Sequence, residues 1–245
     1  MQRLLAPGKI IVAPELCALA IMTKAPRAGA VKTRLQPPLT AGGAAAMNIC
    51  FLRDTADAIM RAGEQTRGVG VYTPVGEEKV YETILPHAFD LIPQRGDSFG
   101  ERLIFAIQDL FSVGFTSCCL IDSDSPTVTA ETFRAAADAL QKPGDRVVIG
   151  PSDDGGYYLI GMKKLHRRLF EEIDWSTGRV IEQTKERARE IGVEVHLLAN
   201  FFDVDDRATL HRLCDELVGY DSESAPATKQ FLRALIAREG RARIW

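Results

Sequence analysis

The sequence predicts a three-layer α/β fold, in which helices cover both faces of a mostly parallel sheet. Three observations support this fold. Short, continuous apolar runs such as CALAIMT (17–23) are typical of buried parallel strands. Segments with helical spacing of apolar residues alternate with these runs, as βαβ units require. A length of 245 residues with 46% hydrophobic residues is enough for one large domain with a real core.

The elements follow in chain order from these patterns. Strands are expected at 17–23, 68–73, 89–93, 118–121, 146–150, 157–162 and 193–198. Helices are expected at 40–62, 99–111, after Thr129, and at 179–191, 206–218 and 228–238. The short connection within 151–162 favours an antiparallel element in the sheet. We predict one domain over 1–245, with a flexible segment at 220–227 before a C-terminal helix within 226–240.

Several polar residues stand where helices are expected to begin. The candidate N-caps are Thr129, one of Asp97 and Ser98, one of Ser176 and Thr177, and one of Asp205 and Asp206, of which Asp206 is the better suited. Their side-chain oxygens can accept hydrogen bonds from the first free backbone N–H groups of a helix.

Charge and composition exclude several classes of function. The net charge is −3, with 30 basic and 33 acidic residues, which gives no electrostatic basis for binding duplex nucleic acid. No apolar run approaches the roughly 18 residues of a membrane span, and no cleavage signal follows the N-terminus, so we expect a cytoplasmic protein. The five cysteines include no Cys-x-x-Cys pair. Cys17, Cys118 and Cys119 lie in apolar strand-like runs and are expected to be reduced core residues. The four scattered histidines suggest no zinc site.

The loop after the first strand is the first candidate site. Its residues suited to phosphate binding are Lys24, Arg27, Gly29, Lys32, Thr33 and Arg34. Lysine and arginine supply counter-charges, and glycine allows backbone N–H groups to approach a phosphate chain. The loop matches neither a Walker A motif nor Gly-x-Gly-x-x-Gly. The alternative interpretation is a solvated basic loop.

The segment Leu120–Pro126 is the most informative stretch. It places Asp122 and Asp124 at the end of a buried strand, with Ser123 between them. Open α/β sheets bind ligands at this edge, and carboxylates suit Mg²⁺ or Mn²⁺ shared with a diphosphate. The alternative interpretation is a turn held by an aspartate side chain.

Two later acidic segments complete the candidate site. Asp153, Asp154, Gly155 and Gly156 form a sharp loop in which Asp154 could act as a base; the alternative is a hairpin turn. Asp205 follows the last strand and could share a metal with Asp124, with Asp203 as the reserve candidate. Trp175 could stack on a ligand or belong to the core.

The order of these motifs resembles a known family. Lys-x-Pro-x-x-Gly-x-x-Lys-Thr-Arg-Leu, Ser-Asp-Ser-Pro, Asp-Gly-Gly-Tyr-Tyr-Leu-Ile-Gly, Trp-Ser-Thr and Asp-Val-Asp occur in sequence over about residues 17–215. This order is similar to the bacterial GT-A-like glycosyltransferases of the radical-SAM/selenodomain-associated type, within the nucleotide-diphospho-sugar transferase superfamily. It is also similar to the molybdenum-cofactor nucleotidyltransferases and to phospholactate guanylyltransferase.

The resemblance implies a GT-A/Rossmann-like sheet with a nucleotide over the first loop. By the match, Lys24, Lys32 and Arg34 face phosphates, with Ser123 beside them. Asp124 is the metal-binding acid, Asp205 matches a second metal position, and Asp154 with its two glycines lines the acceptor side. In its first loop the chain has Ala-Pro-Arg-Ala-Gly in place of the Gly-Gly-rich turn of the nucleotidyltransferases.

The sequence thus predicts a transferase that depends on Mg²⁺ or Mn²⁺, with a nucleotide-sugar as donor and a small molecule as acceptor. Asp154 and Lys32 are the candidate catalytic residues. Asp122, Asp124 and Asp205 are the candidate metal ligands. The first alternative is a nucleotidyltransferase that joins an NTP to a phosphorylated small molecule. The second is a nucleotide-binding module without catalysis.

Overall fold

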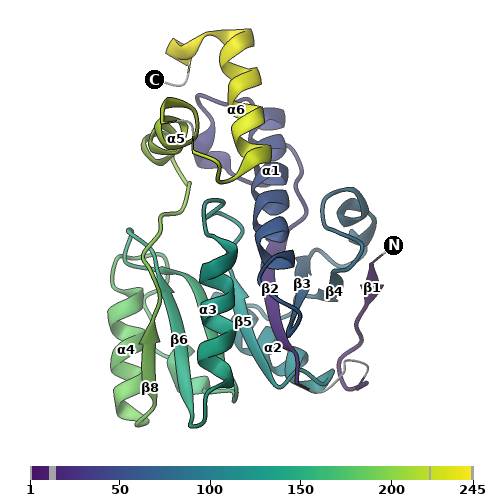
Figure 1. Cartoon of the computed structure of the whole chain (residues 1–245), viewed down its shortest axis with the longest axis vertical. Helices are drawn as coiled ribbons and strands as arrows, with labels where there is room; N and C mark the ends of the chain where they lie inside the picture. Colours follow the sequence, from purple (N-terminus) through teal and green to yellow (C-terminus); the bar gives the residue numbers. More distant parts are fainter. Residues whose placement is uncertain (1, 11–14, 221, 244–245) are drawn as a thin grey trace.

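The computed structural model describes residues 2–10, 15–220 and 222–243, and it is built around one eight-stranded sheet (Figure 1). The strands are β1 (Arg3–Leu4), β2 (Cys17–Lys24), β3 (Thr66–Thr73), β4 (Asp90–Pro93), β5 (Ser117–Ile121), β6 (Arg146–Pro151), β7 (Tyr157–Met162) and β8 (Glu194–Leu197). Their spatial order is β1-β4-β3-β2-β5-β7-β6-β8. Only β7 runs antiparallel to its neighbours, β5 and β6, which confirms the antiparallel element expected from the short connection.

The helices also lie close to their predicted positions. They are α1 (Ala41–Met60), α2 (Phe99–Ser112), α3 (Ala130–Gln141), α4 (Val180–Glu190), α5 (Arg207–Cys214) and α6 (Pro226–Glu239). Shorter helical segments are η1 (Thr33–Leu35), η2 (Glu78–Thr83), η3 (Arg167–Phe170), the π-helical η4 (Asp215–Gly219) and η5 (Arg241–Arg243). The helix expected at 206–218 is divided into α5 and η4. Within the described residues, no helix combines the length and the apolar character needed to cross a membrane.

The central strand β2 shows why the fold has three layers. Cys17, Leu19 and Ile21 face one core, which contains apolar side chains of α1 and α3. Ala18 and Ala20 face a second core on the opposite side of the sheet, which contains side chains of α2. Because successive strand residues point to opposite faces, a continuous apolar strand requires cover on both sides. The predicted three-layer arrangement is therefore confirmed.

A third core lies beyond the sheet, between α1 and the C-terminal helices. Leu35 and Phe51 pack there against Leu210, Leu213 and further side chains of α5, η4 and α6. Figure 1 shows α6 alongside the upper part of α1. The Asp54 carboxylate of α1 accepts the backbone N–H groups of Ala227 and Thr228 at 2.8 Å, at the first turn of α6. This core holds the first loop and the last helices at one end of the sheet.

Most of the predicted helix caps are confirmed. Ser98 caps α2 in a reciprocal pair with Glu101, while Thr129 caps α3 and Asp206 caps α5. The cap expected from Ser176 or Thr177 is wrong, because α4 begins only at Val180 and the Thr177 hydroxyl donates to the Asp174 carbonyl.

Other expectations concern the cysteines and the segment before α6. All five cysteines are buried and free, which agrees with the expectation for Cys17, Cys118 and Cys119. The expected flexible segment 220–227 contains residue 221, which lies outside the described residues, and its last two residues already belong to α6.

Candidate functional site

The candidate site lies at the edge of the sheet where β2 and β5 end. These strands are parallel neighbours, with Ile21 beside Ile121, so the loops that follow them leave the sheet side by side. Residues 198–206 come from β8 and cross the same edge. Their path is fixed in part by the Val204 N–H, which donates to the Asp124 carbonyl at 2.9 Å. Three segments that are distant in sequence therefore meet at one point.

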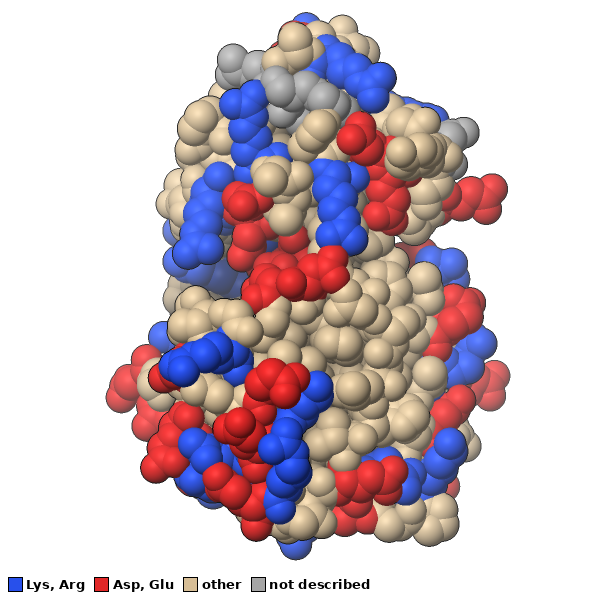
Figure 2. All heavy atoms as spheres, turned by 90° about the vertical axis from the view of Figure 1, so that its left-hand side faces the viewer, with Lys and Arg blue, Asp and Glu red and all other residues tan. Residues whose placement is uncertain are grey.

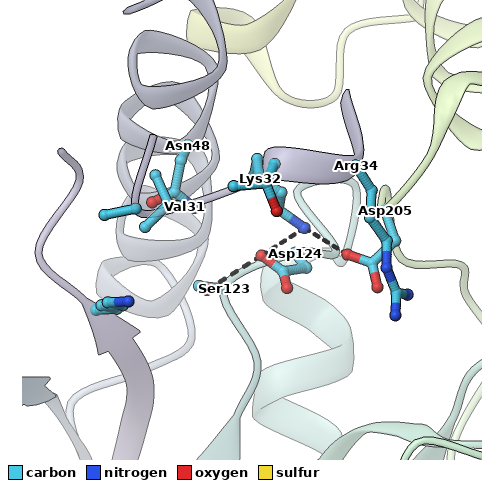
Figure 3. A pocket seen from close by; sticks show the side chains of 10 residues that line it. Val31, Lys32, Arg34, Asn48, Ser123, Asp124 and Asp205 are labelled. Carbon is cyan, nitrogen blue, oxygen red and sulfur yellow. Dashed lines mark hydrogen bonds and ion pairs between the residues drawn. The ribbon is translucent and has the colours of Figure 1, made fainter. Parts of the chain in front are cut away.

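A cavity of about 280 Å³ lies between these segments, and we call it the basic cavity (Figure 3). It is lined by Lys24, Ala30, Val31, Lys32, Thr33, Arg34, Asn48, Ser123, Asp124 and Asp205. Lys24 and Arg34 are exposed, and neither forms an ion pair with another residue in the described part of the chain. Their charges are available to an anionic ligand, as the sequence predicted for phosphate.

Lys32 differs from these two cations because its side chain is only 5% exposed. Its backbone adopts the left-handed conformation (φ 48°) immediately before η1. The ammonium Nζ lies 2.8 Å from each of three oxygens: Asp124 Oδ1, Asp205 Oδ1 and the Val204 carbonyl. Burial alone would lower the pKa of Lys32, but the charges of the two aspartates outweigh it and raise the pKa. Lys32 is therefore held in its charged form.

The structure brings Asp124 and Asp205 together, as the shared-metal hypothesis requires. Since both Oδ1 atoms lie 2.8 Å from the same nitrogen, they are at most about 5.6 Å apart, twice that distance. Figure 3 shows that the ammonium of Lys32 lies between them. Among the described residues, no three His, Cys, Asp and Glu side chains are grouped so as to hold a metal ion. Metal binding here stays a prediction, and it would need further ligands from a substrate.

Asp122 is used differently from Asp124. Its Oδ1 accepts the backbone N–H groups of Asp124 and Ser125 at 3.2 and 3.3 Å, and its Oδ2 accepts the Ser125 hydroxyl at 2.8 Å. These bonds form the aspartate-held turn that the sequence left open as an alternative. Burial, together with the charge of Asp124, raises the pKa of Asp122 to about 8. Both oxygens thus serve the loop, and metal ligation by Asp122 stays a prediction.

A second cavity, of about 420 Å³, adjoins the first, and we call it the acidic cavity. It is lined by Arg34, Phe99, Asp122, Ser152, Asp154, Gly156, Tyr157, Trp175, Ser176, Thr177, Gly178, Val180, Asp203 and Asp205. Four aspartates stand against one arginine, and Arg34 and Asp205 also line the basic cavity. Figure 2 shows acidic side chains across the middle of one face of the molecule, with basic side chains gathered above them.

Asp203 illustrates the acidic character of this cavity. Burial and the charge of Asp154, with a smaller effect of Asp205, raise the pKa of its carboxyl group. The Ser152 hydroxyl donates to Asp203 Oδ1 at 2.9 Å. Asp203, the reserve candidate for metal binding, therefore belongs to the acidic cavity.

An aromatic pair forms one wall of the acidic cavity. The rings of Phe99 and Trp175 meet nearly edge to face, with centroids 4.9 Å apart, and Phe99 is 50% exposed. The position of Trp175 in this wall keeps open its predicted role in stacking on a ligand.

Gly155 supports the loop that carries this wall. At φ +86°, a Cβ added to Gly155 would lie 2.2 Å from the Gly178 carbonyl oxygen. The loop 152–156 can approach residues 174–178 so closely only because residue 155 has no side chain. Gly155 thus acts through packing, whereas Gly156 lines the cavity itself.

Besides Gly155, three further predicted site residues are not among the residues that line either cavity. Arg27 forms an ion pair with Glu77, so its guanidinium is engaged away from the basic cavity. Gly29 provides a turn at φ +77° with open space around it. Asp153 binds Arg212 of α5 and also accepts a hydrogen bond from Asn200, so its carboxylate joins two segments of the chain. Ligand binding by these three residues stays a prediction.

Asn48 is a site residue that the sequence did not reveal. It lies on α1, is 3% exposed and lines the basic cavity, and its amide makes no hydrogen bond within the described residues. An amide that faces a cavity and has no partner in the protein can donate and accept hydrogen bonds with a ligand. The available signal was a single asparagine in an Ala-rich amphipathic segment.

The fold is that of the nucleotide-diphospho-sugar transferase class. A crystal structure from Desulfovibrio desulfuricans G20, described as a "putative nucleotide-diphospho-sugar transferase", is 30% identical. It covers 92% of this chain and 98% of its own, with a TM-score of 0.79. A cytidylyltransferase from Leptospira borgpetersenii has a TM-score of 0.53 at 10% identity, covering 95% of this chain and 97% of its own. A nucleotidyl transferase from Methanothermobacter has a TM-score of 0.52 at 14% identity, covering 84% and 99%. At such low identity, the last two show the fold alone.

The chain belongs to the bacterial family DUF2064, described as "Uncharacterized protein conserved in bacteria", whose model matches residues 55–177. No curated protein matches the chain. The expected relation to GT-A-like transferases of the nucleotide-diphospho-sugar superfamily is confirmed, and the chain is classed with these transferases.

Proposed function

We propose that the protein transfers a glycosyl group from a nucleotide-sugar to a small-molecule acceptor. One observation carries this proposal: a basic cavity and an acidic cavity adjoin at the sheet edge and share Arg34 and Asp205. A nucleotide-sugar is complementary to this pair of cavities. Its anionic diphosphate matches the basic cavity, and the hydroxyl groups of its neutral sugar match the carboxylates of the acidic cavity. The 30% identical structure, described as a "putative nucleotide-diphospho-sugar transferase", supports the same class of function.

The basic cavity is suited to the diphosphate. Lys24 and Arg34 offer cationic groups that form no ion pair in the described part of the chain. The guanidinium of Arg34 can donate two parallel hydrogen bonds to one phosphate group. The Thr33 hydroxyl and the Asn48 amide offer neutral hydrogen bonds. These groups would stabilise the negative charge that develops on the leaving diphosphate.

The acidic cavity is suited to the sugar and the acceptor. Its carboxylates can accept hydrogen bonds from hydroxyl groups, and the face of Trp175 can pack against a sugar ring. Asp154 is the proposed base, because its Oδ1 is oriented by the Gly156 N–H at 2.8 Å and its carboxylate lines the cavity. The acceptor oxygen bonds to the anomeric carbon and its proton passes to Asp154. The bond to the diphosphate breaks, and its electron pair stays on the leaving oxygen.

A divalent cation fits the residues at the boundary of the two cavities. Asp124 and Asp205 present two carboxylates close together, and Mg²⁺ sites commonly combine one or two carboxylates with substrate phosphates. Mg²⁺ or Mn²⁺ held there would neutralise charge on the leaving diphosphate. In the structure, the positively charged ammonium of Lys32 already lies between these two carboxylates.

Nucleotidyl transfer is the second candidate. The fold shared with a cytidylyltransferase and a nucleotidyl transferase, together with the cations next to Asp124, favours it. The charge of the acidic cavity argues against it, because a phosphorylated acceptor would face Asp154, Asp203 and Asp205, with Arg34 as the one cation in the lining.

The nature of the leaving group distinguishes these functions. The protein is mixed with NTPs or nucleotide-sugars, Mg²⁺ or Mn²⁺, and neutral or phosphorylated acceptors. Glycosyl transfer releases a nucleoside diphosphate, and nucleotidyl transfer releases pyrophosphate. Transfer should be lost in Asp154→Asn while donor affinity is kept. Pyrophosphate release would contradict the glycosyl proposal, and nucleotide binding without turnover would indicate a binding module.

A further inference from the structure

We infer that Lys32 is a built-in cation of the Asp124–Asp205 pair and that divalent-metal binding requires its ammonium to leave. The first part stands on geometry alone. The second part, in which a phosphate-bearing ligand receives the ammonium, rests on the proposed function. Together they make metal and phosphate binding depend on each other at this site.

The geometry shows that Lys32 occupies the position of a metal ion. Its Nζ lies 2.8 Å from one oxygen of each carboxylate and 2.8 Å from the Val204 carbonyl. The side chain is 5% exposed, although the two aspartates are 32% and 43% exposed. The charge is thus delivered from within the protein, by a residue 172 positions from Val204 in the sequence.

A metal ion and this ammonium cannot use the same oxygens together. A Mg²⁺ ion would lie about 2.0–2.1 Å from each ligand oxygen, which leaves no room for a second cation in contact with both oxygens. The two positive charges would also repel each other strongly in a partly buried site. The lysine side chain must therefore move before a metal can bind the two Oδ1 atoms together, and while it stays, its charge also disfavours a metal at the neighbouring Oδ2 atoms.

The basic cavity offers the ammonium another place. Lys32 lines it together with Lys24, Thr33 and Arg34, where the diphosphate is proposed to bind. A lysine ammonium is a compact charge on a flexible stem, so it can turn from carboxylate to phosphate. A phosphate ligand would then open the carboxylate pair to the metal. By linkage, the metal must strengthen binding of that ligand by the same factor.

The test measures Mn²⁺ binding to the full chain by electron paramagnetic resonance of the free ion. Without nucleotide, the wild type should bind Mn²⁺ weakly. Lys32→Met should bind it at least tenfold more tightly, because the carboxylate pair is left without its cation. Lys32→Gln, which keeps a hydrogen-bond donor, provides a second variant should the first fold poorly. Lys24→Met is the matched control: it removes one charge from the same cavity without vacating the pair, and its Mn²⁺ affinity should rise far less.

Two further measurements test whether the ion binds the aspartate pair and whether phosphate binding assists it. Asp205→Asn added to Lys32→Met should abolish the gain. With UDP, CDP, ADP or GDP bound, the Mn²⁺ affinity of the wild type should rise at least tenfold, and that of Lys32→Met should rise less. Equal or weaker Mn²⁺ binding by both Lys32 variants would overturn the inference. If none of the nucleotides binds, the proposed function fails, while the metal-only comparison still decides the role of Lys32.

Discussion

At the scale of single residues, the site contains polar groups in two different conditions. Asp122, Asp153 and Lys32 have their hydrogen bonds satisfied within the protein. Asn48 and Arg34 face the basic cavity without such partners in the described part of the chain. A satisfied group holds the site in shape, whereas a group without a partner gains a hydrogen bond only when a ligand arrives. Substitution should therefore separate stability effects from binding effects.

Asn48→Leu tests this distinction. We expect nucleotide affinity to fall by about 0.5–1.5 kcal/mol, the value of a neutral hydrogen bond. The free energy of unfolding should change little, because the amide faces the cavity and makes no hydrogen bond within the described residues. Calorimetric nucleotide titration and urea unfolding measure the two quantities. Thr55→Val is the control, since Thr55 is also buried on α1 with an unpaired hydroxyl but lines no part of the basic cavity. Equal nucleotide affinities in wild type and Asn48→Leu would exclude the contact.

Asp122 should make stability depend on pH. Its pKa of about 8 in the folded protein, raised by burial and by Asp124, exceeds the value of about 3.9 for an unfolded chain. Between these values the folded protein holds a proton that the unfolded chain has lost, so stability should fall as pH rises from about 4 to 8. Asp122→Asn keeps the hydrogen-bonding shape without the charge. Urea unfolding at pH 5 and pH 8 should show a smaller loss in the variant, and parallel losses would refute the assignment.

At the scale of elements, a feature could be predicted from the sequence when the residues that form it are close together in the chain. Seven strands could be predicted, because the pattern that indicates a strand lies within the strand segment itself. The two-residue β1 is too short to show such a pattern. Caps such as Ser98 and Asp206 were found because a cap acts within three residues. The contact of Lys32 with Asp205 spans 173 positions and depends on residues 198–206 crossing the sheet edge. No local pattern encodes that path, so the sequence did not predict the contact of the ammonium with the two aspartates.

Gly155→Ala tests how two loops build the acidic cavity. The added Cβ would lie 2.2 Å from the Gly178 carbonyl oxygen at an unfavourable φ of +86°. We expect a stability loss of about 1–3 kcal/mol and loss of transfer to acceptor, with nucleotide affinity nearly kept. Thermal unfolding and transfer assays provide the measurement.

Gly29→Ala is the control for backbone strain alone. Gly29 has a similar φ of +77° with nothing within 4 Å of an added Cβ. Its cost should be only the strain of a left-handed residue, about 1 kcal/mol. If both variants lose the same stability, the close approach to Gly178 has no energetic role.

At the scale of the whole molecule, the topology brings opposite charges to one edge of the sheet. The basic loop follows β2, and Asp124 follows the neighbouring strand β5. Asp203 and Asp205 arrive from β8 at the far end of the sheet, because residues 198–206 return across β6 and β5. Arg34 is the one cation among the described residues that line the acidic cavity, and it also lines the basic one. It is therefore placed where a donor's diphosphate would meet its sugar.

Arg34→Ala tests this placement. We expect the affinity for a nucleoside diphosphate to fall by about 1.5–3 kcal/mol, the range of a hydrogen bond to a charged group. The affinity for the corresponding nucleoside should change far less, because the base and ribose do not carry the charge that Arg34 binds. Raising the salt concentration should reduce the difference between wild type and variant, since exposed charges are screened.

Arg27→Ala is the matched control: it removes the same side chain from the same loop, but Arg27 is paired with Glu77 outside both cavities. Calorimetric titration of both variants with diphosphate and nucleoside decides the matter. Equal losses for the two ligands, or equal losses in the two variants, would remove Arg34 from the diphosphate site.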